Sequence, residues 1–452
     1  MYQLHEIKRV EGSGFGFPDV GLLDGVIYLF NQVTETISSN FNNLMIKTNA
    51  WKSLCERIRS GDIEMSPEAV LATVKFMNDI ASNNLDNIPI IIGDMNNVKA
   101  VIQILKNKVL KSFSNWPVSR GGGGVFLSSL INRSVEFLRL LYNQASVQEK
   151  ENEKLLADLI KVIHKEELMK YCIGTLEFVS MENFGIPLNF LSTMVQTSNH
   201  FTKQYIKYGG LQPEFVQQII DNANPPNIII DGLSILSQIA RMSNDYYKQI
   251  HQVKIYSNIK DLLKHKDNEV RAKVCNLVGN MCRHSAFFYE ALDQFSLLPE
   301  LIQRCKDLDS NTRKFACFAI GNASFHNSSL YKALAPSIPP LIELLSDSSE
   351  DKTRANAAGA LGNLVRNSNE LVKDLLKYGA IEALVKVSCD SNTSARKIAL
   401  FSLGNFCQFE ECCAILKQLS FEKTLLDIMN KFQDDSGLQK YCSRILSQLS
   451  KV

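Results

Sequence analysis

The sequence lacks the features that mark membrane, secreted and nucleic-acid-binding proteins. Its 452 residues contain no apolar run of the roughly 18–20 residues that span a bilayer. The opening residues, MYQLHEIKRV, lack the apolar core of a signal peptide. Lys and Arg number 49 against 47 Asp and Glu, and a net charge of +2 gives no strong field toward polyanions. We therefore expect a cytoplasmic protein that binds neither nucleic acid nor membrane.

Paired cysteines and metal-ligand clusters are also missing. The 11 cysteines are odd in number, and none forms a Cys-x-x-Cys pair. Cys407 lies near Cys412 and Cys413, but no histidine close in sequence completes a zinc set. We expect small buried thiols on helices, with no metal and no cofactor.

What the sequence does contain is an internal repeat. The dipeptide Gly-Asn recurs with spacings of 42, 41 and 42 residues, at Gly279–Asn280, Gly321–Asn322, Gly362–Asn363 and Gly404–Asn405. An arginine stands eight residues before each of these glycines, at Arg271, Arg313, Arg354 and Arg396. A period of about 40–47 residues is typical of solenoids with two or three helices per repeat.

Small and apolar residues around each Gly-Asn recur every three or four positions, which predicts one buried face of a helix. A glycine inside a helix costs roughly 1 kcal/mol relative to alanine, so its recurrence predicts close contact with a neighbouring helix. Ser237–Gln238 and Ser447–Gln448 fall about one period outside the clear copies and predict degenerate end repeats.

The fold class that follows is all-α, an armadillo/HEAT-like right-handed helical solenoid with an N-terminal helical region. We expect an N-terminal helical region with glycine-rich loops over 1–150. Degenerate armadillo-like repeats are expected over 151–254, and armadillo repeats with a degenerate C-terminal cap over 255–452. The glycines in Glu11–Gly25 have no strand–loop–helix context and no Gly-Lys-Ser/Thr, so a structural turn is favoured over a phosphate loop. The loop Ser119–Gly124 is either a hinge or closely packed.

These residues carry a resemblance. The repeat resembles the armadillo family, whose third helix lines a concave groove and carries a recurrent asparagine. Segments 281–292, 312–331 and 350–368, with the loops at 12–25 and 116–125, are similar to the C-terminal region of the Fused-type serine/threonine kinases. That family implies roles in Hedgehog signalling, in the central pair of motile cilia and, in plants, in cytokinesis through kinesins.

The chain departs from that family because the kinase motifs are absent: there is no Val-Ala-Ile-Lys, no His-Arg-Asp and no Asp-Phe-Gly. We expect a non-catalytic scaffold for proteins. The resemblance implies kinesin-like, microtubule-associated or axonemal central-pair partners, and a place in the cytoplasm, the cytoskeleton and the axoneme of a cilium or flagellum. The alternative is the docking or regulatory half of a Fused-type kinase whose catalytic domain lies outside this chain.

The candidate partner-binding groove contains Asn280, Asn322, Asn363, Asn405, Phe318, Phe401, His284, His326, Arg283 and Arg366. An asparagine amide both donates and accepts, so a ladder of them can hold an extended peptide. The alternative, equally weighted, is that these amides bond the neighbouring repeat. Phe318 and Phe401 stand where importin-type proteins have tryptophan, which disfavours recognition of nuclear signals. The four repeat arginines are expected to pair with acids or helix ends between repeats.

Overall fold

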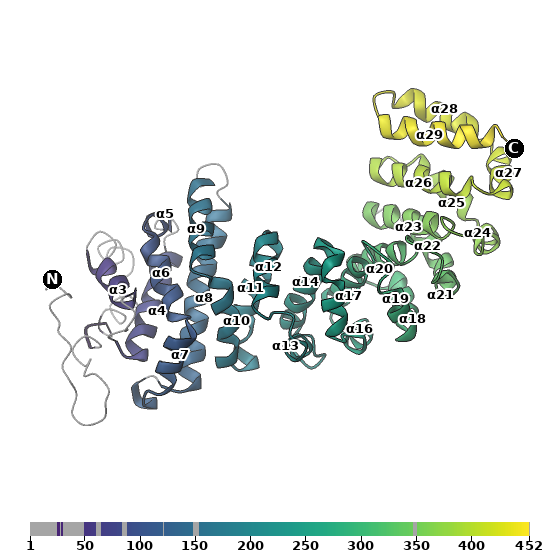
Figure 1. Ribbon diagram of the computed structural model, residues 1–452. Coiled ribbons are helices and arrows are strands. Elements are labelled where there is room, and N and C mark those ends of the chain that lie inside the picture. Colours follow the sequence, from purple (N-terminus) through teal and green to yellow (C-terminus); the bar gives the residue numbers. More distant parts are fainter. Residues whose placement is uncertain are drawn as a thin grey trace. The chain divides into compact units, whose positions relative to one another are not determined.

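A computed structural model describes residues 25–27, 29, 49–59, 65–83, 88–120, 122–147, 153–346 and 350–451. Every regular element in these ranges is an α-helix or a short 3-10 helix (Figure 1). The chain divides into two compact units, Met1–Gly210 and Leu211–Val452. Across the described ranges, the helices are too short or too polar to cross a lipid bilayer.

The first unit is built around one long helix, α8 (Gly124–Val147), which packs against α4 (Pro67–Asn83) and α11 (Gly185–Thr197). Buried residues of α8 recur every three or four positions, as Leu127, Leu130, Ile131, Val135 and Leu138. The other helices are α3 (Asn49–Arg59), α5 (Ile88–Gly93), α6 (Met95–Ile104), α7 (Asn107–Ser114), α9 (Glu153–Lys165), α10 (Leu168–Thr175) and α12 (Asn199–Lys207). Short 3-10 helices are η3 (Val118–Arg120), η4 (Leu176–Phe178) and η5 (Met181–Asn183).

The second unit repeats a set of three helices. It opens with α13 (Pro213–Ile219), α14 (Pro226–Met242) and η6 (Asn244–Tyr246). The repeats are then α15 (Tyr247–Gln252), α16 (Tyr256–Leu262) and α17 (Asn268–Met281); α18 (Tyr289–Gln294), α19 (Leu297–Gln303) and α20 (Ser310–Ala323); α21 (Tyr331–Leu334), α22 (Ile338–Leu345) and α23 (Asp351–Asn363); α24 (Val372–Lys377), α25 (Ala380–Ser388) and α26 (Thr393–Phe406); and α27 (Glu410–Gln418), α28 (Phe421–Lys431) and α29 (Ser436–Leu449). The 3-10 turns η7 (Arg304–Lys306) and η8 (Ala335–Ser337) lie within them.

The third helices of these repeats stack in chain order: α14 packs on α17, α17 on α20, α20 on α23, α23 on α26 and α26 on α29 (Figure 1). Most of them begin at a side-chain cap. Asp267, Asp309, Asn392 and Asp435 each accept a hydrogen bond from a backbone N–H in the first turn of the following helix. Each such cap contributes about 1 kcal/mol to the stability of the helix. The sequence therefore fixes the start of the long helix in each of these four repeats.

The corner between the first and second helices of a repeat needs a left-handed residue. Gly379 takes this conformation between α24 and α25, with a φ of 75°. Lys254, Ser296 and Ser420 take it at the equivalent corners, with φ of 57°, 52° and 52°. The left-handed conformation costs a residue with a Cβ roughly 1 kcal/mol or more in conformational free energy. The corners at Lys254, Ser296 and Ser420 are therefore mildly strained.

The all-α, armadillo/HEAT-type fold predicted from the sequence is confirmed. Ser237–Gln238 lies in α14 and Ser447–Gln448 in α29, so both degenerate ends are third helices of the same stack. The predicted limits at 150 and 254 fall inside the two compact units, which divide at Gly210. The change in repeat character that those limits describe stays a prediction.

The structure describes only one of the two predicted glycine-rich loops in enough detail to compare with its prediction. Residues 11–24 of the first lie outside the described part of the chain, so its predicted turn stays a prediction. In the second, the N–H of Gly122 donates to the carbonyl of Pro117 at 3.0 Å. A Cβ on Gly122 would lie 1.6 Å from the carbonyl oxygen of Trp116. This loop is therefore closely packed, and only glycine fits at residue 122.

The predicted buried thiols are also found. All eleven cysteines are free, and all are buried except Cys389. Burial raises the pKa of the Cys442 thiol to about 11 and that of Cys412 to about 12. Thiols with a raised pKa are poor nucleophiles, so these residues serve as small apolar groups in the helix stack.

Candidate functional site

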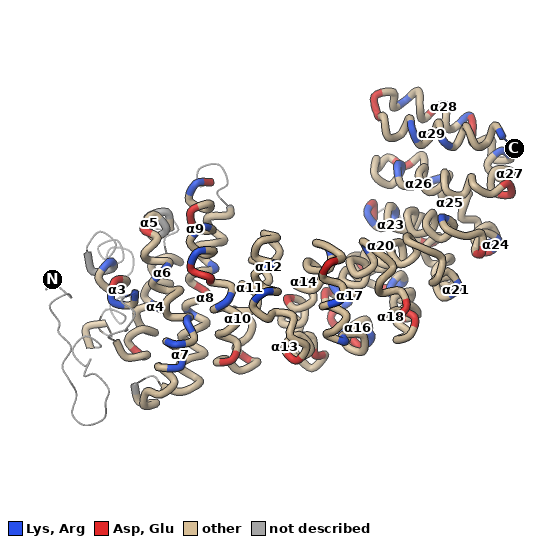
Figure 2. Tube along the Cα trace, viewed as in Figure 1, with Lys and Arg blue, Asp and Glu red and all other residues tan. Residues whose placement is uncertain are grey.

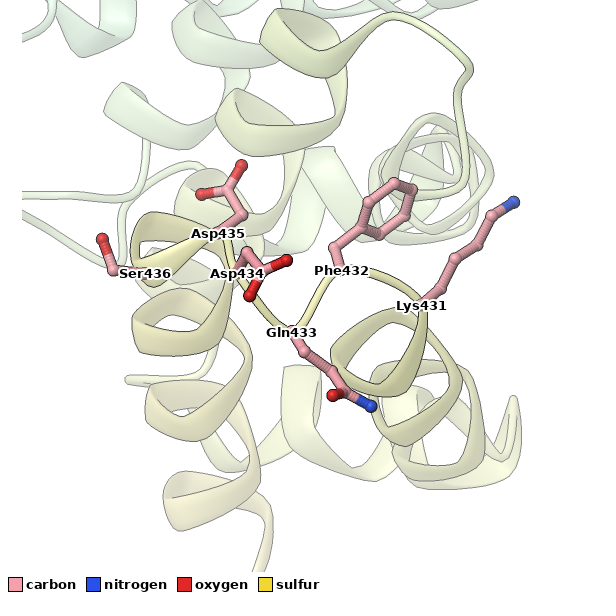
Figure 3. A pocket seen from close by; sticks show the side chains of 6 residues that line it. All are labelled: Lys431, Phe432, Gln433, Asp434, Asp435 and Ser436. Carbon is pink, nitrogen blue, oxygen red and sulfur yellow. The ribbon is translucent and has the colours of Figure 1, made fainter.

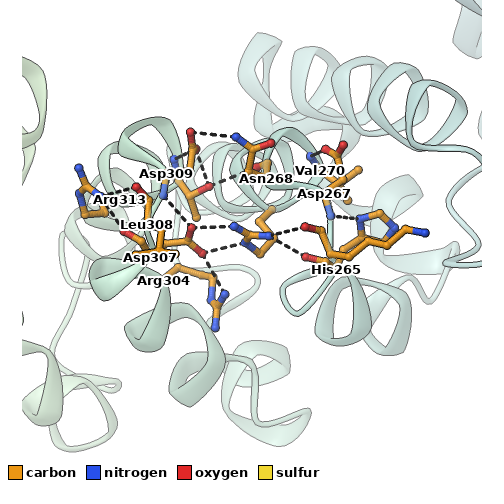
Figure 4. A network of polar contacts seen from close by, with 12 residues as sticks. His265, Asp267, Asn268, Val270, Arg304, Asp307, Leu308, Asp309 and Arg313 are labelled. Atoms are coloured by element: carbon orange, nitrogen blue, oxygen red, sulfur yellow. Dashed lines mark hydrogen bonds and ion pairs between the residues drawn. The ribbon is translucent and has the colours of Figure 1, made fainter.

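An arginine on each of the four third helices α17, α20, α23 and α26 links its own repeat to the next. Nε and Nη2 of Arg271 donate to the two carboxylate oxygens of Asp307, both at 2.8 Å. Nη1 of the same side chain donates to the carbonyls of His265 and Lys266, at 2.8 and 3.1 Å. Arg304 adds a further bond to Asp307 at 3.0 Å, as Figure 4 shows. Arg271 therefore holds the loop before α17 and the acid before α20 at the same time.

The carboxylate of Asp307 is almost fully buried, with 3% of its side chain exposed. Burial opposes its ionised form. The hydrogen bonds from Arg271 and from the backbone N–H of Asp309 outweigh that effect and hold the pKa of Asp307 below its ordinary value. Removing one partner from such a pair would leave a buried charge without compensation.

The same link recurs in the later repeats, with a different acceptor each time. The acceptor follows the arginine by 36 or 37 residues in each ion pair, and the pairs are Arg271–Asp307, Arg313–Glu350 and Arg354–Asp390. In the fourth copy of the link, the guanidinium of Arg396 on α26 lies 3.9 Å from the ring centroid of Phe432 instead of an acid. The structure thus places all four arginines between repeats, on acids, on loop carbonyls or on a ring.

The repeat asparagines also point into the stack. Nδ2 of Asn322 donates to the carbonyl of Gly279 at 2.8 Å, and Asn363 bonds Gly321 in the same way at 2.9 Å. Asn405 repeats the contact with Gly362 at 3.2 Å. Asn280 has no such partner and donates to Ser237 and Asn276. Each of the three amides Asn322, Asn363 and Asn405 therefore spends one N–H on the preceding repeat, as the alternative reading of these residues predicts.

A tyrosine ladder, which the sequence analysis did not predict, supports the C-terminal ends of α17, α20 and α23. The tyrosine hydroxyl donates to the main-chain carbonyl of the repeat asparagine, in the pairs Tyr247–Asn280, Tyr289–Asn322 and Tyr331–Asn363. Each hydroxyl also accepts a backbone N–H four residues beyond that asparagine, from His284, His326 and Asn367. Burial raises the pKa of Tyr247 to about 12 and also raises that of Tyr289 and Tyr331. The 42-residue spacing of these tyrosines was the available signal.

The two histidines of the predicted groove make polar contacts within the stack. Nε2 of His284 lies 2.8 Å from the carbonyl of Arg241, and Nε2 of His326 lies 3.1 Å from that of Cys282. A carbonyl only accepts, so Nε2 carries the proton in both rings. Arg283 is exposed, and the guanidinium of Arg366 lies 4.1 Å from the ring centroid of Phe325. The histidines therefore act as structural hydrogen-bond donors.

Only two of the four repeat glycines are required by packing. A Cβ on Gly279 would lie 2.4 Å from the ring of Phe318, and one on Gly362 would lie 2.7 Å from Cα of Ser402. At Gly321 and Gly404 the nearest atoms are 3.6 and 3.5 Å away, which is ordinary contact. The predicted reason for glycine therefore holds at Gly279 and Gly362 and is wrong at the other two.

Side chains of the third helices that keep part of their surface exposed form what we call the third-helix face: Lys273, Lys314, Phe315, Phe318, Lys352, Asn356, Ile398 and Phe401. All are half-buried except Lys352, which is exposed. A pocket of about 270 Å³ between α17 and α20 is lined by Asn268, Glu269, Ala272, Lys273, Asp309, Asn311 and Phe315. Of the predicted groove residues, this face keeps the two phenylalanines.

The lysines of the third-helix face lack acidic partners. Within the described ranges, Lys273, Lys314 and Lys352 make no ion pair, whereas Lys397 pairs with Asp435 at 2.8 Å. Burial, together with the charge of Lys352, lowers the pKa of Lys314. An anionic group beside Lys314 would favour its charged form and offset both effects.

A second hollow lies at the last repeat. It has a volume of about 430 Å³ and is formed by the loop between α28 and α29, from Lys431 to Ser436 (Figure 3). Asp435 in this loop caps α29 and bonds Lys397, and Phe432 receives Arg396. These contacts give the loop a structural role in closing the stack.

Stacked three-helix repeats, linked by side chains at equivalent positions, define an α-solenoid of the armadillo/HEAT type, which is a scaffold fold. A family model for the HEAT-like repeat matches residues 311–364, from α20 to α23. A solved structure of an engineered protein aligns with 84% of this chain and 94% of its own, at 17% identity and a TM-score of 0.57. A designed armadillo repeat protein aligns with 52% of this chain and 99% of its own, at 22% identity and a TM-score of 0.48.

Among curated proteins, the chain is similar to the serine/threonine-protein kinase TIO of Arabidopsis thaliana. The two are 41% identical over 320 residues, which cover 65% of this chain and 24% of the relative. The predicted resemblance to the Fused-type kinases is thereby confirmed. The chain spans about a quarter of that relative's length, and the matched family model is a repeat and not a kinase domain.

Proposed function

We propose that this chain is a non-catalytic scaffold whose third-helix face holds an extended segment of a partner protein. The observation that supports this proposal is that some side chains of the third helices bond within the stack while others stay partly exposed. The asparagines, tyrosines and arginines bond within the stack, while Phe315, Phe318 and Phe401 stay half-buried and three lysines have no acidic partner among the described residues. Half-buried rings offer apolar contact, and the lysines fit a segment that carries acidic residues.

Asn322 and Asn363 have a smaller role in the proposed peptide binding. Their Nδ2 groups are engaged by the preceding repeat, but both side chains are half-buried and not fully enclosed. A carbonyl oxygen accepts hydrogen bonds from two directions, so each can still accept a peptide N–H. Asn280 and Asn405, which are buried, contribute to the stack.

The similarity to a kinase favours one setting for this scaffold. We propose that it acts as the docking or regulatory part of a Fused-type serine/threonine kinase, in Hedgehog-type signalling, with catalysis supplied from outside this chain. The matching kinase extends well beyond the aligned part, since this chain covers 24% of it. The second candidate is a kinase-less scaffold of the axonemal central pair or of a kinesin- or microtubule-linked complex. That candidate places the protein on the cytoskeleton and in the cilium or flagellum.

Affinity capture of the native protein from ciliated cells, with mass spectrometry of the bait, separates these settings. A bait much heavier than 50.8 kDa that yields kinase peptides would support the docking half of a kinase. A bait near that mass, captured with central-pair or kinesin proteins, would support the axonemal scaffold.

The binding face has its own test. Lys314→Glu with Lys352→Glu should abolish capture of the partners retained by the wild type, because two attractive charges become repulsive. The matched control is Lys332→Glu with Lys373→Glu, which changes net charge equally at exposed positions of α21 and α24. Equal loss of capture in both variants would refute the third-helix face as the binding surface.

A further inference from the structure

A cluster of lysine and tyrosine side chains lies in the first unit, apart from anything used above. Its members come from three helices: Lys106 at the start of α7, Lys170 and Tyr171 in α10, and Lys207 with Tyr208 at the end of α12. α10 packs against both α7 and α12, which brings these distant parts of the sequence together. Figure 2 shows blue segments along α7 and near α10 and α12. We call this group the lysine–tyrosine cluster.

Two tyrosine rings organise the cluster. The ammonium groups of Lys106 and Lys170 lie 5.8 and 5.7 Å from the ring centroid of Tyr171. Those of Lys170 and Lys207 lie 6.0 and 4.9 Å from that of Tyr208. Each ring therefore has two ammonium groups at cation–π distance, and Lys170 is shared between them. The two rings thus connect the three lysines in the order Lys106, Lys170, Lys207.

One carboxylate, that of Glu167, contacts members of the cluster. The hydroxyl of Tyr208 donates to Oε1 of Glu167 at 2.5 Å, and the ammonium group of Lys170 lies 3.7 Å from Oε2. The hydrogen bond from Tyr208 lowers the pKa of Glu167, so this group stays ionised. Glu167 therefore bonds one ring and one lysine and also feels the charge of Lys207, but one carboxylate cannot balance three ammonium groups.

The charge balance of the cluster favours an anionic ligand. Three lysines meet one carboxylate, and α7 adds the exposed Lys108 and Lys111. Lys106 and Lys207 form no ion pair with any described residue. Concentrated positive charge of this kind attracts an anion and discriminates against other partners more than it stabilises the fold.

The geometry distinguishes between classes of polyanion. Nucleic acid bound by a basic and aromatic surface stacks its bases on open ring faces. Here each tyrosine ring is already attended by two ammonium groups, so it is not free to receive a base. The cluster also contains no arginine, the residue suited to bidentate phosphate recognition. Separate point charges in a row match carboxylates spaced along a polypeptide.

We infer that the lysine–tyrosine cluster binds an acidic segment, rich in Asp or Glu, of a partner protein. This surface belongs to the first unit and is independent of the third-helix face proposed above for the second.

The test measures binding of a fluorescent polyglutamate peptide by anisotropy at low salt, using the full chain with Lys314→Glu and Lys352→Glu so that the third-helix face does not contribute. The site variant is Lys106→Glu, Lys170→Glu and Lys207→Glu together. The control, matched in charge, is Lys332→Glu, Lys373→Glu and Lys423→Glu on exposed positions of the second unit. We expect the site variant to weaken binding about tenfold or more, from three modest exposed contacts turned repulsive, and the control to weaken it less than about twofold.

Two further measurements keep the inference falsifiable. Glu167→Gln still accepts from Tyr208 but removes the competing carboxylate, and should tighten binding roughly two- to threefold. Carbodiimide cross-linking should join the peptide to lysines of the cluster. Equal weakening by the site and control variants, or cross-links confined to the second unit, would overturn the inference. So would tighter binding of single-stranded RNA than of polyglutamate, if it is lost in the site variant.

Discussion

The same substitution, glycine to alanine, should have opposite effects in two copies of one repeat. Gly321 and Gly362 occupy equivalent positions on α20 and α23. Around Gly321, the nearest atoms to an added Cβ belong to Ala360, at 3.6 Å and beyond. Around Gly362, they belong to Ser402: Oγ at 2.3 Å, Cβ at 2.4 Å and Cα at 2.7 Å. The new methyl group therefore fits in the first copy and collides with backbone in the second.

The magnitudes follow from two opposing effects. Alanine is favoured over glycine inside a helix by about 1 kcal/mol, so Gly321→Ala should raise the free energy of unfolding by roughly 0.5–1 kcal/mol. Gly362→Ala receives the same gain but must push α23 and α26 apart by about 1 Å, and overpacking costs about 1–3 kcal/mol. It also threatens the bond from Oγ of Ser402 to the carbonyl of Ala358, worth about 1 kcal/mol. We expect a net loss of about 1–3 kcal/mol.

Urea unfolding followed by circular dichroism measures both effects on the full chain. The midpoint should rise for Gly321→Ala and fall for Gly362→Ala. Combining Gly362→Ala with Ser402→Gly removes the colliding Cβ and Oγ, so the two changes should show a favourable coupling energy. A destabilised Gly321→Ala, or a Gly362→Ala variant as stable as the wild type, would refute the packing argument.

The other predictions concern the links and corners of the second unit. Arg271→Leu leaves Asp307 buried with fewer partners and should lower the free energy of unfolding by about 2–4 kcal/mol in urea titrations, whereas an effect below about 0.5 kcal/mol would contradict the link. The pKa values of Asp307 and Asp390 lie below their ordinary range, so the stability that these groups contribute is present above about pH 4 and is lost as pH falls further. A variant with Asp307→Asn and Asp390→Asn should therefore be less stable at neutral pH and lose less on acidification, as seen in unfolding midpoints across acid pH. Ser296→Gly should stabilise by about 0.5–1 kcal/mol in thermal melts because its corner is left-handed, and an unchanged or lower midpoint would argue against strain there.

The fold was predictable because its signal is periodic. Arginine and Gly-Asn recur in four copies, and a stack of equivalent helices is the arrangement that buries such a pattern. The partners of the arginines were also present in the sequence, since Asp307, Glu350 and Asp390 follow at nearly constant distance. Phe432 in the last position does not share their chemistry, so no search for acids finds it.

The role of the asparagines could not be read in the same way. Periodicity places Asn322 and Asn363 on one helix face, but a small rotation of that helix decides whether the amide meets a peptide or the next repeat. The structure turns both toward the carbonyl of a preceding glycine. The tyrosine ladder was missed because its first helices are short, and a four-residue helix such as α21 gives no amphipathic pattern. The lysine–tyrosine cluster joins residues with no common period.

The arginine links also set an order in which the second unit opens. A solenoid behaves as a chain of nearest-neighbour couplings, so fraying starts where the coupling is weakest. Three of the four arginine links are ion pairs, while the last is the contact of Arg396 with a ring, beside the more exposed ion pair of Lys397 with Asp435, and α29 carries Gln439 in place of an arginine. Amide protons of α28 and α29 should therefore exchange with solvent before those of α17 and α20. Such a gradient would let one end of the array reshape itself around a partner while the other end stays rigid.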